Sequence, residues 1–215
     1  MLITGIKSKP VYAPLQADTR GRYHLMVGMG VGAAPLLRVI AEMRSASAQS
    51  LKNTRVLFVP DAGPAPGAGA ASKAGAAPAL EQFAAAAVGG VQAFPNTPEL
   101  LGHFRAILAE SSMGARLYVA GPESFIGLVM KIALEFNLNK DEIRAEECGT
   151  LARRVYCIHC RATTENVRTN VARCVQCQRW LLVRDHYSRR LAAYMGVMAD
   201  AEAPGELPPV KEVFL

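Results

Sequence analysis

The sequence predicts an α/β protein, with a doubly wound, mostly parallel sheet followed by a small four-cysteine zinc ribbon. Three observations predict it. Apolar strand patterns alternate with helical patterns over residues 23–148, which is typical of a parallel sheet wrapped on both faces. A glycine-rich stretch follows the first strand of this series. Behind the series, residues 155–180 hold two C-x-x-C pairs.

The first strand is expected at 23–27, and the turn 28–35 leads into a helix whose apolar periodicity covers 36–46. A second buried strand is expected at 55–60. The remaining elements are a helix at 80–88, a strand at 91–94, a helix at 97–112 with Thr97 as N-cap and Pro98 at its first position, a strand at 115–120, a helix at 121–138 and a strand at 141–148.

Composition divides the chain into four parts. Residues 1–22 are polar and interrupted by prolines, so we expect an N-terminal arm before a domain over 23–149. Within that domain, residues 62–79 are almost entirely Ala, Gly and Pro and predict a flexible surface insertion, because they offer little to bury. The ribbon is expected at 150–190, and a C-terminal tail at 191–215.

Positive charge is concentrated in the cysteine-containing part. The chain has a formal net charge of +6, and residues 151–190 contain nine arginines against one aspartate and one glutamate. Such a field suits an acidic partner surface or nucleic acid. No uncharged run reaches the length of about 18 residues that a membrane helix needs, and no signal peptide pattern is found. We therefore expect a cytoplasmic protein that does not enter a membrane.

The four paired cysteines predict a metal site, with the ligands Cys157, Cys160, Cys174 and Cys177. Two C-x-x-C turns separated by 13 residues can place four thiolates around a tetrahedral Zn²⁺. A rubredoxin-type iron site is the alternative, but its turns normally carry glycine where this chain has Arg161 and Gln178, which favours structural zinc. The fifth cysteine, Cys148, is expected to be a buried spectator.

The glycine-rich turn "GMGVGAAP" suggests a phosphate site, because glycines let backbone N–H groups approach an anion at a helix N-terminus. Together with "AGPESF" at 120–125 it resembles the nicotinamide-dinucleotide domain of the ferredoxin reductase family. The resemblance covers about residues 23–149 and implies NAD(P)H contacts from Gly28, Gly30, Gly32, Pro35, Gly121 and Pro122.

This chain departs from the ferredoxin reductase pattern in its polar residues. Ala34 replaces the Ser or Thr that bonds the pyrophosphate, and Ala120 replaces the cysteine near the nicotinamide. The flavin motif R-x-Y-S is not found, and 22 residues before the first strand are too few for a flavin-holding barrel. The fold is therefore expected to be kept while its chemistry is reduced, and no catalytic residue is predicted.

After the second cysteine pair, "WLLV" at 180–183 is expected to be the last ribbon strand. Residues 185–196 predict a short amphipathic helix, and 204–215 an extended arm. The polar run 184–190 contains Asp185 and His186, but an interface or a solvated face explains it better than acid–base chemistry.

The ribbon and the run "LLVRDHYSRRLAAYMGV" resemble the family of small subunits of bacterial dimethylamine monooxygenases. That resemblance implies a multi-subunit enzyme that oxidatively demethylates dimethylamine with O2 and NAD(P)H. It also implies two partners, a haem-bearing oxygenase subunit and a flavin and iron–sulfur reductase subunit. The residues leave two alternatives open, an NAD(P)H-linked electron-transfer protein with an iron site and a zinc-ribbon protein that binds nucleic acid. Sparse aromatic residues make nucleic acid the weaker expectation.

Overall fold

The computed structural model describes residues 8–18, 20–46, 48–60, 76–86, 88–111 and 114–215. The chain forms two compact units. One spans Tyr12–Gly149, and the other combines the residues up to Val11 with Thr150–Leu215. The predicted parts differ from these units, because the expected arm 1–22 is shared between them and the expected tail 191–215 lies in the second.

The unit 12–149 is built on one five-stranded sheet in the order β3-β2-β1-β4-β5, with every neighbouring pair parallel. Its strands are β1 (Tyr23–Met29), β2 (Thr54–Val59), β3 (Gly90–Ala93), β4 (Ala115–Gly121) and β5 (Ile143–Glu147). Parallel neighbours need crossover connections, and helices supply them here. The predicted α/β fold with a parallel sheet is confirmed.

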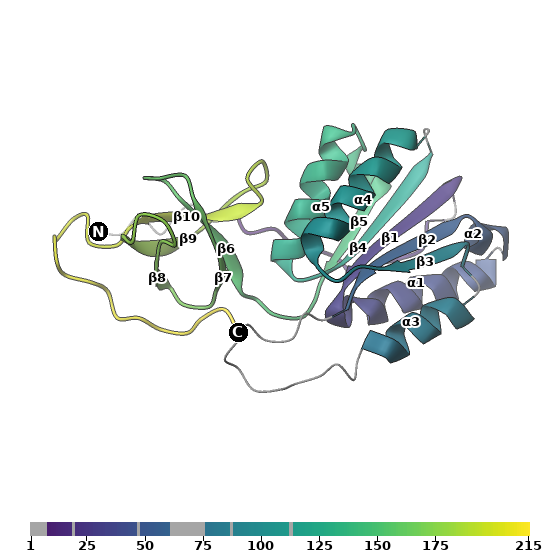
Figure 1. Ribbon diagram of the computed structural model, residues 1–215, viewed down its shortest axis with the longest axis horizontal. Helices are drawn as coiled ribbons and strands as arrows, with labels where there is room; N and C mark the ends of the chain where they lie inside the picture. The colour runs from purple at the N-terminus through teal and green to yellow at the C-terminus, as the bar shows by residue number, and fades with distance from the viewer. Residues whose placement is uncertain (1–7, 19, 47, 61–75, 87, 112–113) are drawn as a thin grey trace. The chain divides into compact units, whose positions relative to one another are not determined.

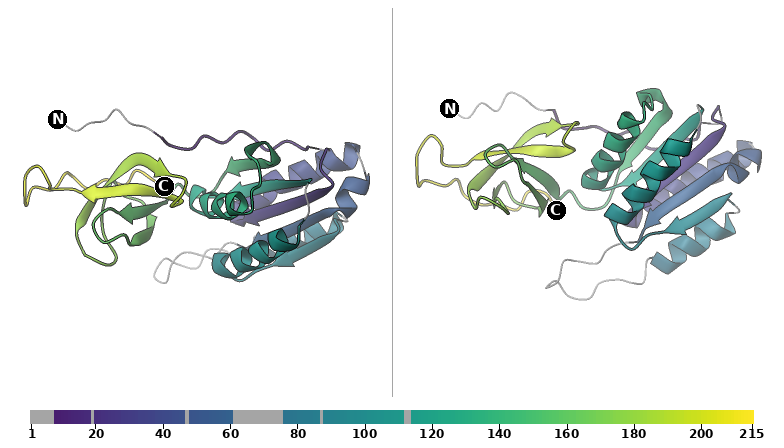
Figure 2. Two further views of the ribbon diagram at one scale, coloured as in Figure 1. Left: turned by 90° about the horizontal axis from the view of Figure 1, so that it is seen from above. Right: turned by 45° about the horizontal axis from the view of Figure 1, so that its top comes forward.

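Helices cover both faces of this sheet. They are the 3-10 turn η1 (Gly30–Gly32), α1 (Ala33–Ala46), α2 (Ala48–Lys52), α3 (Ala76–Ala85), α4 (Thr97–Glu110), α5 (Glu123–Glu135) and the 3-10 turn η2 (Lys140–Glu142). Figure 1 shows α1 and α3 on one face and α4 and α5 on the other. The turned views in Figure 2 show the same two helical layers.

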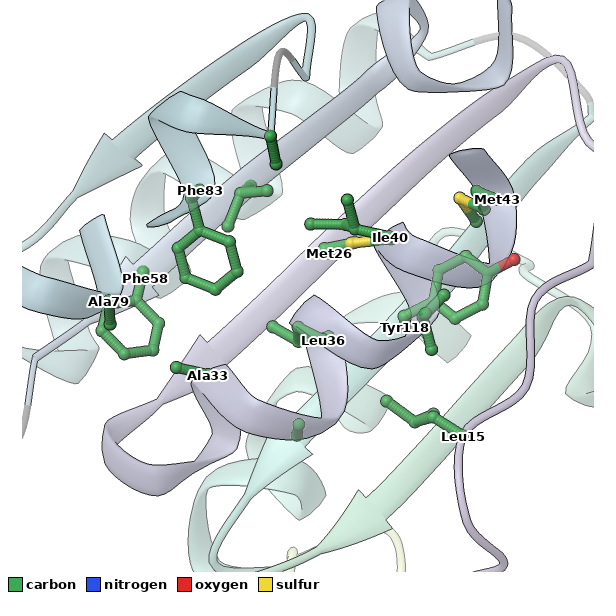
Figure 3. Packing of buried hydrophobic residues seen from close by; sticks show 14 of the residues in the cluster. Leu15, Met26, Ala33, Leu36, Ile40, Met43, Phe58, Ala79, Phe83 and Tyr118 are labelled. Carbon is green, nitrogen blue, oxygen red and sulfur yellow. The ribbon is translucent and has the colours of Figure 1, made fainter. Parts of the chain in front are cut away.

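Two apolar cores follow from this arrangement, one on each face of the sheet. The first joins the sheet to α1 and α3, where Phe58 and Phe83 meet edge to face with their ring centroids 5.5 Å apart (Figure 3). The second joins the opposite sheet face to α4 and α5 and includes Phe104 and Phe125. Strands buried on both faces explain why their sequences are continuous apolar runs.

Two local predictions for this unit are wrong. Helix α4 is capped by Asn96, whose side chain accepts from the backbone N–H of Glu99 at 2.9 Å, so Thr97 and Pro98 are its first two residues. Residues 76–79, expected to end the flexible insertion, belong to α3. The rest of that insertion, 62–75, lies outside the described residues.

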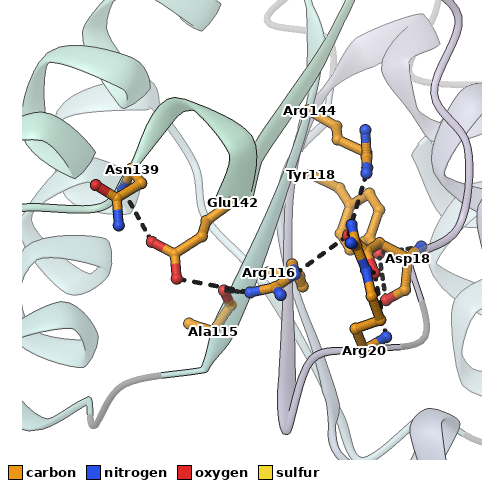
Figure 4. Close-up of polar contacts among 8 residues, drawn as sticks. All are labelled: Asp18, Arg20, Ala115, Arg116, Tyr118, Asn139, Glu142 and Arg144. Carbon is orange, nitrogen blue, oxygen red and sulfur yellow. Dashed lines mark hydrogen bonds and ion pairs between the residues drawn. The ribbon is translucent and has the colours of Figure 1, made fainter.

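The segment 12–18 is bound to the sheet through Leu15, which is apolar and buried, and through Asp18, which is acidic and buried. Leu15 is 1 % exposed, and its backbone N–H donates to Glu146 Oε2 at 2.6 Å. Asp18 is 4 % exposed, and its carboxylate accepts hydrogen bonds from the side chains of Arg20, Arg116 and Arg144 (Figure 4). The Tyr118 hydroxyl accepts from the backbone N–H of Asp18 at 2.9 Å.

The second unit has a five-stranded sheet in the order β7-β6-β10-β9-β8. Its strands are β6 (Arg153–Cys157), β7 (Thr163–Val167), β8 (Val171–Arg173), β9 (Trp180–Ser188) and β10 (Ala193–Met198). All pairs are antiparallel except β6 with β10. One sheet face carries a small core that contains Cys157 and Cys174.

The helix expected over 185–196 is wrong, because these residues complete β9, turn and enter β10. Tyr187 and Tyr194 lie opposite each other and pack edge to face, with ring centroids 5.0 Å apart. The segment 209–214 is held on the residues between β7 and β8 by backbone bonds from Asn170 to Lys211 and from Val213 to Arg168. Phe214 then stacks on the Arg153 guanidinium, 3.7 Å from Cζ to the ring centroid.

Candidate metal centre and glycine-rich turns

The two C-x-x-C pairs form matching turns. In the first, Cys157 N–H donates to Ala162 O and Arg161 N–H donates to Cys157 O, at 2.8 and 2.9 Å. In the second, Cys174 N–H donates to Arg179 O and Gln178 N–H to Cys174 O, at 2.9 and 3.2 Å.

The residue after each second cysteine adopts a left-handed backbone, with φ 67° at Arg161 and 57° at Gln178. Glycine is the residue best suited to this conformation, and other residues are strained there by about 1–2 kcal/mol. The glycines missing from the sequence pattern are therefore replaced without loss of the turn geometry. The larger side chains at these positions do not by themselves separate a zinc site from an iron site.

The four sulfurs gather into one cluster, with all ligand atoms within 4.8 Å of one another. Cys157 Sγ lies 3.7 Å from Cys177 Sγ, and Cys160 Sγ lies 3.5 Å from Cys174 Sγ. These distances are too long for disulfides, whose sulfurs are about 2.05 Å apart. A tetrahedron with metal–sulfur bonds of about 2.3 Å has sulfur–sulfur edges of about 3.8 Å. The donor set therefore fits a tetrahedral divalent ion.

The electrostatics of the cluster also fit a cation. Burial raises the pKa of Cys157 to about 11, whereas the backbone N–H of Arg179 lowers the pKa of Cys177 to about 6. Without a cation, the four thiols would not all lose their protons at neutral pH. A divalent ion would supply the charge that holds four thiolates together.

The cluster is half covered. Cys157 and Cys174 are fully buried in the core of the second unit, while Cys160 and Cys177 are partly exposed at its margin. His159 is exposed between the first pair of cysteines and lies outside the cluster of candidate ligands. Cys148, which follows β5 in the other unit, is half-buried, and burial raises its pKa to about 11. Its reactivity is therefore low, as a spectator role requires.

The candidate nucleotide residues lie together at the carboxyl ends of β1 and β4. Gly28, Gly30 and Gly32 form the end of β1 and the η1 turn, and Pro35 lies in the first turn of α1. Gly121 ends β4, and Pro122 precedes α5. This is the sheet edge at which parallel α/β folds bind ligands.

Packing within the chain accounts for two of these glycines. A Cβ at Gly28 would lie 2.7 Å from Leu36 Cδ1, and a Cβ at Gly32 would overlap the backbone carbonyl of Ala120. At both positions a Cβ would meet the protein itself, because Gly28 faces Leu36 and Phe58 and Gly32 lets η1 approach β4, whether or not a ligand binds.

The same sheet edge carries carboxylates. Glu123, in the first turn of α5, is 4 % exposed, and Glu146 and Glu147 stand in register with Ala120 and Gly121. Arg38 pairs with Glu146. A dinucleotide brings several negative charges, so the acidic groups other than the paired Glu146 disfavour the predicted nucleotide site.

A cavity of about 430 Å³ lies at the opposite edge of this sheet, at the amino ends of β1, β2 and β4. Its lining includes Tyr23, Lys52, Arg55, Ile107 and Ser111, and none of the predicted site residues. The sequence patterns did not predict this cavity, because its walls come from five separate segments without a shared motif.

A parallel α/β unit with a glycine-rich turn and a second unit with a four-cysteine cluster define a two-part protein with one candidate metal centre. The chain belongs to the dimethylamine monooxygenase subunit DmmA-like family. Residues 4–143 match the N-terminal domain of that family, and residues 154–197 match its C-terminal domain.

A curated relative is the heme-dependent oxidative N-demethylase delta subunit of Ectopseudomonas mendocina (strain ymp), which is 34 % identical over 111 residues. The match covers 52 % of this chain and 63 % of the relative. This chain is thus similar to a subunit of an oxidoreductase.

Among solved structures, the ferredoxin reductase of carbazole 1,9a-dioxygenase matches with 18 % identity and a TM-score of 0.41, over 61 % of this chain and 34 % of that one. Ferredoxin-NADP+ reductase from Plasmodium falciparum matches with 12 % identity and a TM-score of 0.43, over 59 % and 52 % of the two chains. In the part of the chain that the structure describes, no helix is both long and apolar enough to cross a membrane.

Proposed function

We propose that this chain is the small accessory subunit of a haem-dependent N-demethylase that acts on dimethylamine. The match of both units to one subunit family, together with the four-sulfur cluster, supports this proposal. The reaction would convert dimethylamine, O2 and NAD(P)H with one proton into methylamine, formaldehyde, water and NAD(P)⁺. The haem would be carried by an oxygenase subunit, and flavin and an iron–sulfur cluster by a reductase subunit.

In this proposal Cys157, Cys160, Cys174 and Cys177 hold one structural Zn²⁺. A closed site with four thiolate ligands leaves no open position for a substrate, so its contribution is to the folding of the second unit. The chain would then act in the cytoplasm as a docking subunit, and the reaction would take place on its companions.

The proposal is tested by reconstituting the complex from separately purified subunits, with and without this chain. We expect demethylation, followed as formaldehyde released per NAD(P)H oxidised, to fall at least tenfold when the chain is left out. Equal rates with and without it would remove the proposal. Identification of the co-purifying subunits by mass spectrometry provides an independent readout.

The nucleotide contacts of Gly28, Gly30, Gly32, Pro35, Gly121 and Pro122 stay a prediction. They are tested by titrating the isolated chain with NADH and NADPH and following by NMR the amide signals of Gly28, Gly30, Gly32 and Gly121, since proline has no amide proton. Shifts that saturate below about 1 mM would support a retained site. The internal packing of Gly28 and Gly32, and the nearby carboxylates, lead us to expect no saturation.

A second candidate function is an electron-transfer protein with iron in the four-cysteine site, because the geometry of the turns suits iron as well as zinc. Both turns have the left-handed residue and the amide-to-carbonyl bonds that a rubredoxin-type site also uses. Elemental analysis of the purified chain separates the two candidates. One zinc per chain and no visible absorption would exclude electron transfer at this site.

A further inference from the structure

We propose that the tips of the two cysteine turns form a docking face for an acidic surface on a companion protein subunit. We call this the knuckle face and define it by Ile158, Val175, Arg161 and Arg173. The inference rests on the proposed function, because it names where and how the chain would dock.

Because the two turns match in their backbone hydrogen bonds, we infer that an approximate two-fold axis relates them. Exchanging them maps the Cys157–Cys177 pair onto Cys174–Cys160, and these sulfur distances are 3.7 and 3.5 Å. A two-fold rotation keeps every atom at its height along the axis. Residues at equivalent positions, such as Ile158 and Val175, therefore lie at the same end of the cluster.

Two apolar side chains are exposed at these equivalent positions, Ile158 at 44 % and Val175 at 63 %. Their backbones are fixed, because Ile158 N–H donates to Gly196 O at 3.2 Å and Val175 N–H donates to Thr164 Oγ1 at 3.2 Å. A metal ion bound by the four cysteines would further restrict the backbones of both turns. Exposed apolar groups on a rigid frame lose little conformational freedom on binding, which favours an interface.

The charges next to these tips in the sequence point to an acidic occupant. Residues 157–162 and 173–180 contain three arginines and no carboxylate. Arg161 and Arg173 have no acidic partner among the residues that the structure describes, whereas Arg154 is neutralised by Glu165 at 2.9 Å. Four thiolates and a divalent ion contribute −2, so these two segments remain positive by one charge.

The composition of the face also fits a protein partner. Arginines beside an apolar centre are enriched at protein interfaces. Arg173 lies over the Trp180 ring, 4.7 Å from Cζ to the ring centroid, which holds its guanidinium in place. Single-stranded nucleic acid needs aromatic platforms on which bases stack, and Trp180 is the one tryptophan of the chain.

The test measures binding of the full, metal-loaded chain to each purified companion subunit by biolayer interferometry at 50 to 300 mM NaCl. The variant Ile158→Glu/Val175→Glu places carboxylates in the apolar centre. Val210→Glu is the matched control, because Val210 is 54 % exposed in the same unit outside both turns. We expect the double variant to weaken binding at least tenfold and the control to change it less than twofold.

A charge pair of variants tests the acidic nature of the partner. Arg161→Gln/Arg173→Gln should flatten the dependence of affinity on salt, while Arg189→Gln/Arg190→Gln, at the exposed turn between β9 and β10, should leave it unchanged. Metal content and the hydrogen-exchange protection of β6, β9 and β10 must match the unmodified chain, so that a loss of binding is not a loss of folding.

The outcomes separate the inference from the function on which it rests. If the unmodified chain binds no companion subunit, both the knuckle face and the proposed function are rejected. If it binds and Ile158→Glu/Val175→Glu binds equally well, only the knuckle face is overturned. It is also overturned if the double variant changes self-association of the chain instead, or if the arginines prove to bind single-stranded DNA or RNA with strong salt dependence.

Discussion

His24 shows how one side chain can carry a pH dependence that the sequence does not reveal. It lies in β1, is 1 % exposed, and neither ring nitrogen has a hydrogen-bond partner among the described residues. Burial lowers its pKa, and Arg116 acts in the same direction, while the nearby Asp18 carboxylate opposes the shift. The imidazole is therefore neutral in the folded chain at neutral pH.

We predict that the unit 12–149 loses stability as the pH falls below about 6.5, the ordinary value for histidine. There the unfolded chain binds a proton at position 24 and the folded chain does not, so unfolding is favoured. Above that pH the effect is absent. The pKa of the Asp18 carboxyl is lowered by Arg20, so its contribution is lost only at more acidic pH, below the ordinary range for aspartate.

An NMR titration of the four histidines measures this directly. We expect the His24 signal to remain in its neutral position at a pH just below about 6.5, the ordinary value for histidine. In His24→Leu, hydrogen exchange of β1 and β4 amides should depend less on pH between 5 and 7. Protonation of His24 at the ordinary histidine value of about 6.5 would contradict the prediction.

Gly32 tests whether the glycine-rich turn is held by packing. A Cβ there would overlap the backbone of β4 at Ala120, which cannot move without shifting the sheet. We predict that Gly32→Ala lowers the free energy of unfolding by about 1–3 kcal/mol. The control is Gly90→Ala in β3, where a Cβ meets nothing within 4 Å, and it should change stability by less than about 0.5 kcal/mol. Urea unfolding measures both, and equal effects would contradict the packing argument.

Single residues differ in how much the sequence reveals about them. The metal cysteines are predictable, because two short turns fix the ligand spacing locally. The burial of Asp18 is not, because two of its three arginine partners are 98 and 126 residues away. Nothing near position 18 in the sequence distinguishes it from an ordinary surface aspartate.

At the level of elements, the N-cap of α4 is Asn96, one residue before the predicted Thr97. The side-chain oxygen of Asn96 accepts from Glu99 N–H, while Thr97 Oγ1 lies 4.0 Å from Met29 Sδ. We predict that Asn96→Ala destabilises the chain by about 1 kcal/mol and that Thr97→Ala changes it by less than about 0.5 kcal/mol. Thermal or urea unfolding measures both variants. A larger loss of stability in Thr97→Ala than in Asn96→Ala would indicate that Thr97 is the N-cap after all.

The β9–β10 hairpin shows why an element can be predicted with the wrong type. Residues 185–196 have apolar positions that suit one face of a helix, and Tyr187 and Tyr194 are seven apart, as on such a face. In the fold they face each other across two strands instead, and Ala192 has a left-handed backbone with φ 49°. Pairing of β10 with β6, 39 residues away in sequence at Tyr194 and Val155, overrides the local pattern.

For the whole molecule, the sequence correctly predicted the order of strands and helices in the first unit except the short α2, since buried parallel strands and amphipathic helices leave strong periodic patterns. It did not predict how segments 8–11 and 209–214 are used, because the backbone and side-chain bonds that hold them join residues far apart in the sequence. The net charge is also distributed unevenly between the two units. Residues 12–149 contain 12 basic and 12 acidic residues, so the full net charge of +6 belongs to the metal-centred unit.

This division predicts that removing the metal unfolds one unit and spares the other. The core of the second unit is small, and two of its buried members are the ligands Cys157 and Cys174. A structural zinc site contributes about 10–16 kcal/mol in small domains near pH 7, more than such a core can replace. After chelation we expect amides of β6, β9 and β10 to lose protection from hydrogen exchange and Trp180 emission to shift to longer wavelength. Amides of β1, β2 and β4 should keep their protection from hydrogen exchange.

Two variants complete this experiment. Cys174→Ser should give a chain without stoichiometric metal and with the same unprotected strands, because three thiolates bind the ion far more weakly than four. Cys148→Ser removes a cysteine from the other unit and should retain one metal ion per chain. If the metal-free chain instead keeps full protection in β6, β9 and β10, the ribbon is stabilised by its apolar core and by the Phe214–Arg153–Tyr194 stack. The cysteines would then have to be explained by a role other than folding.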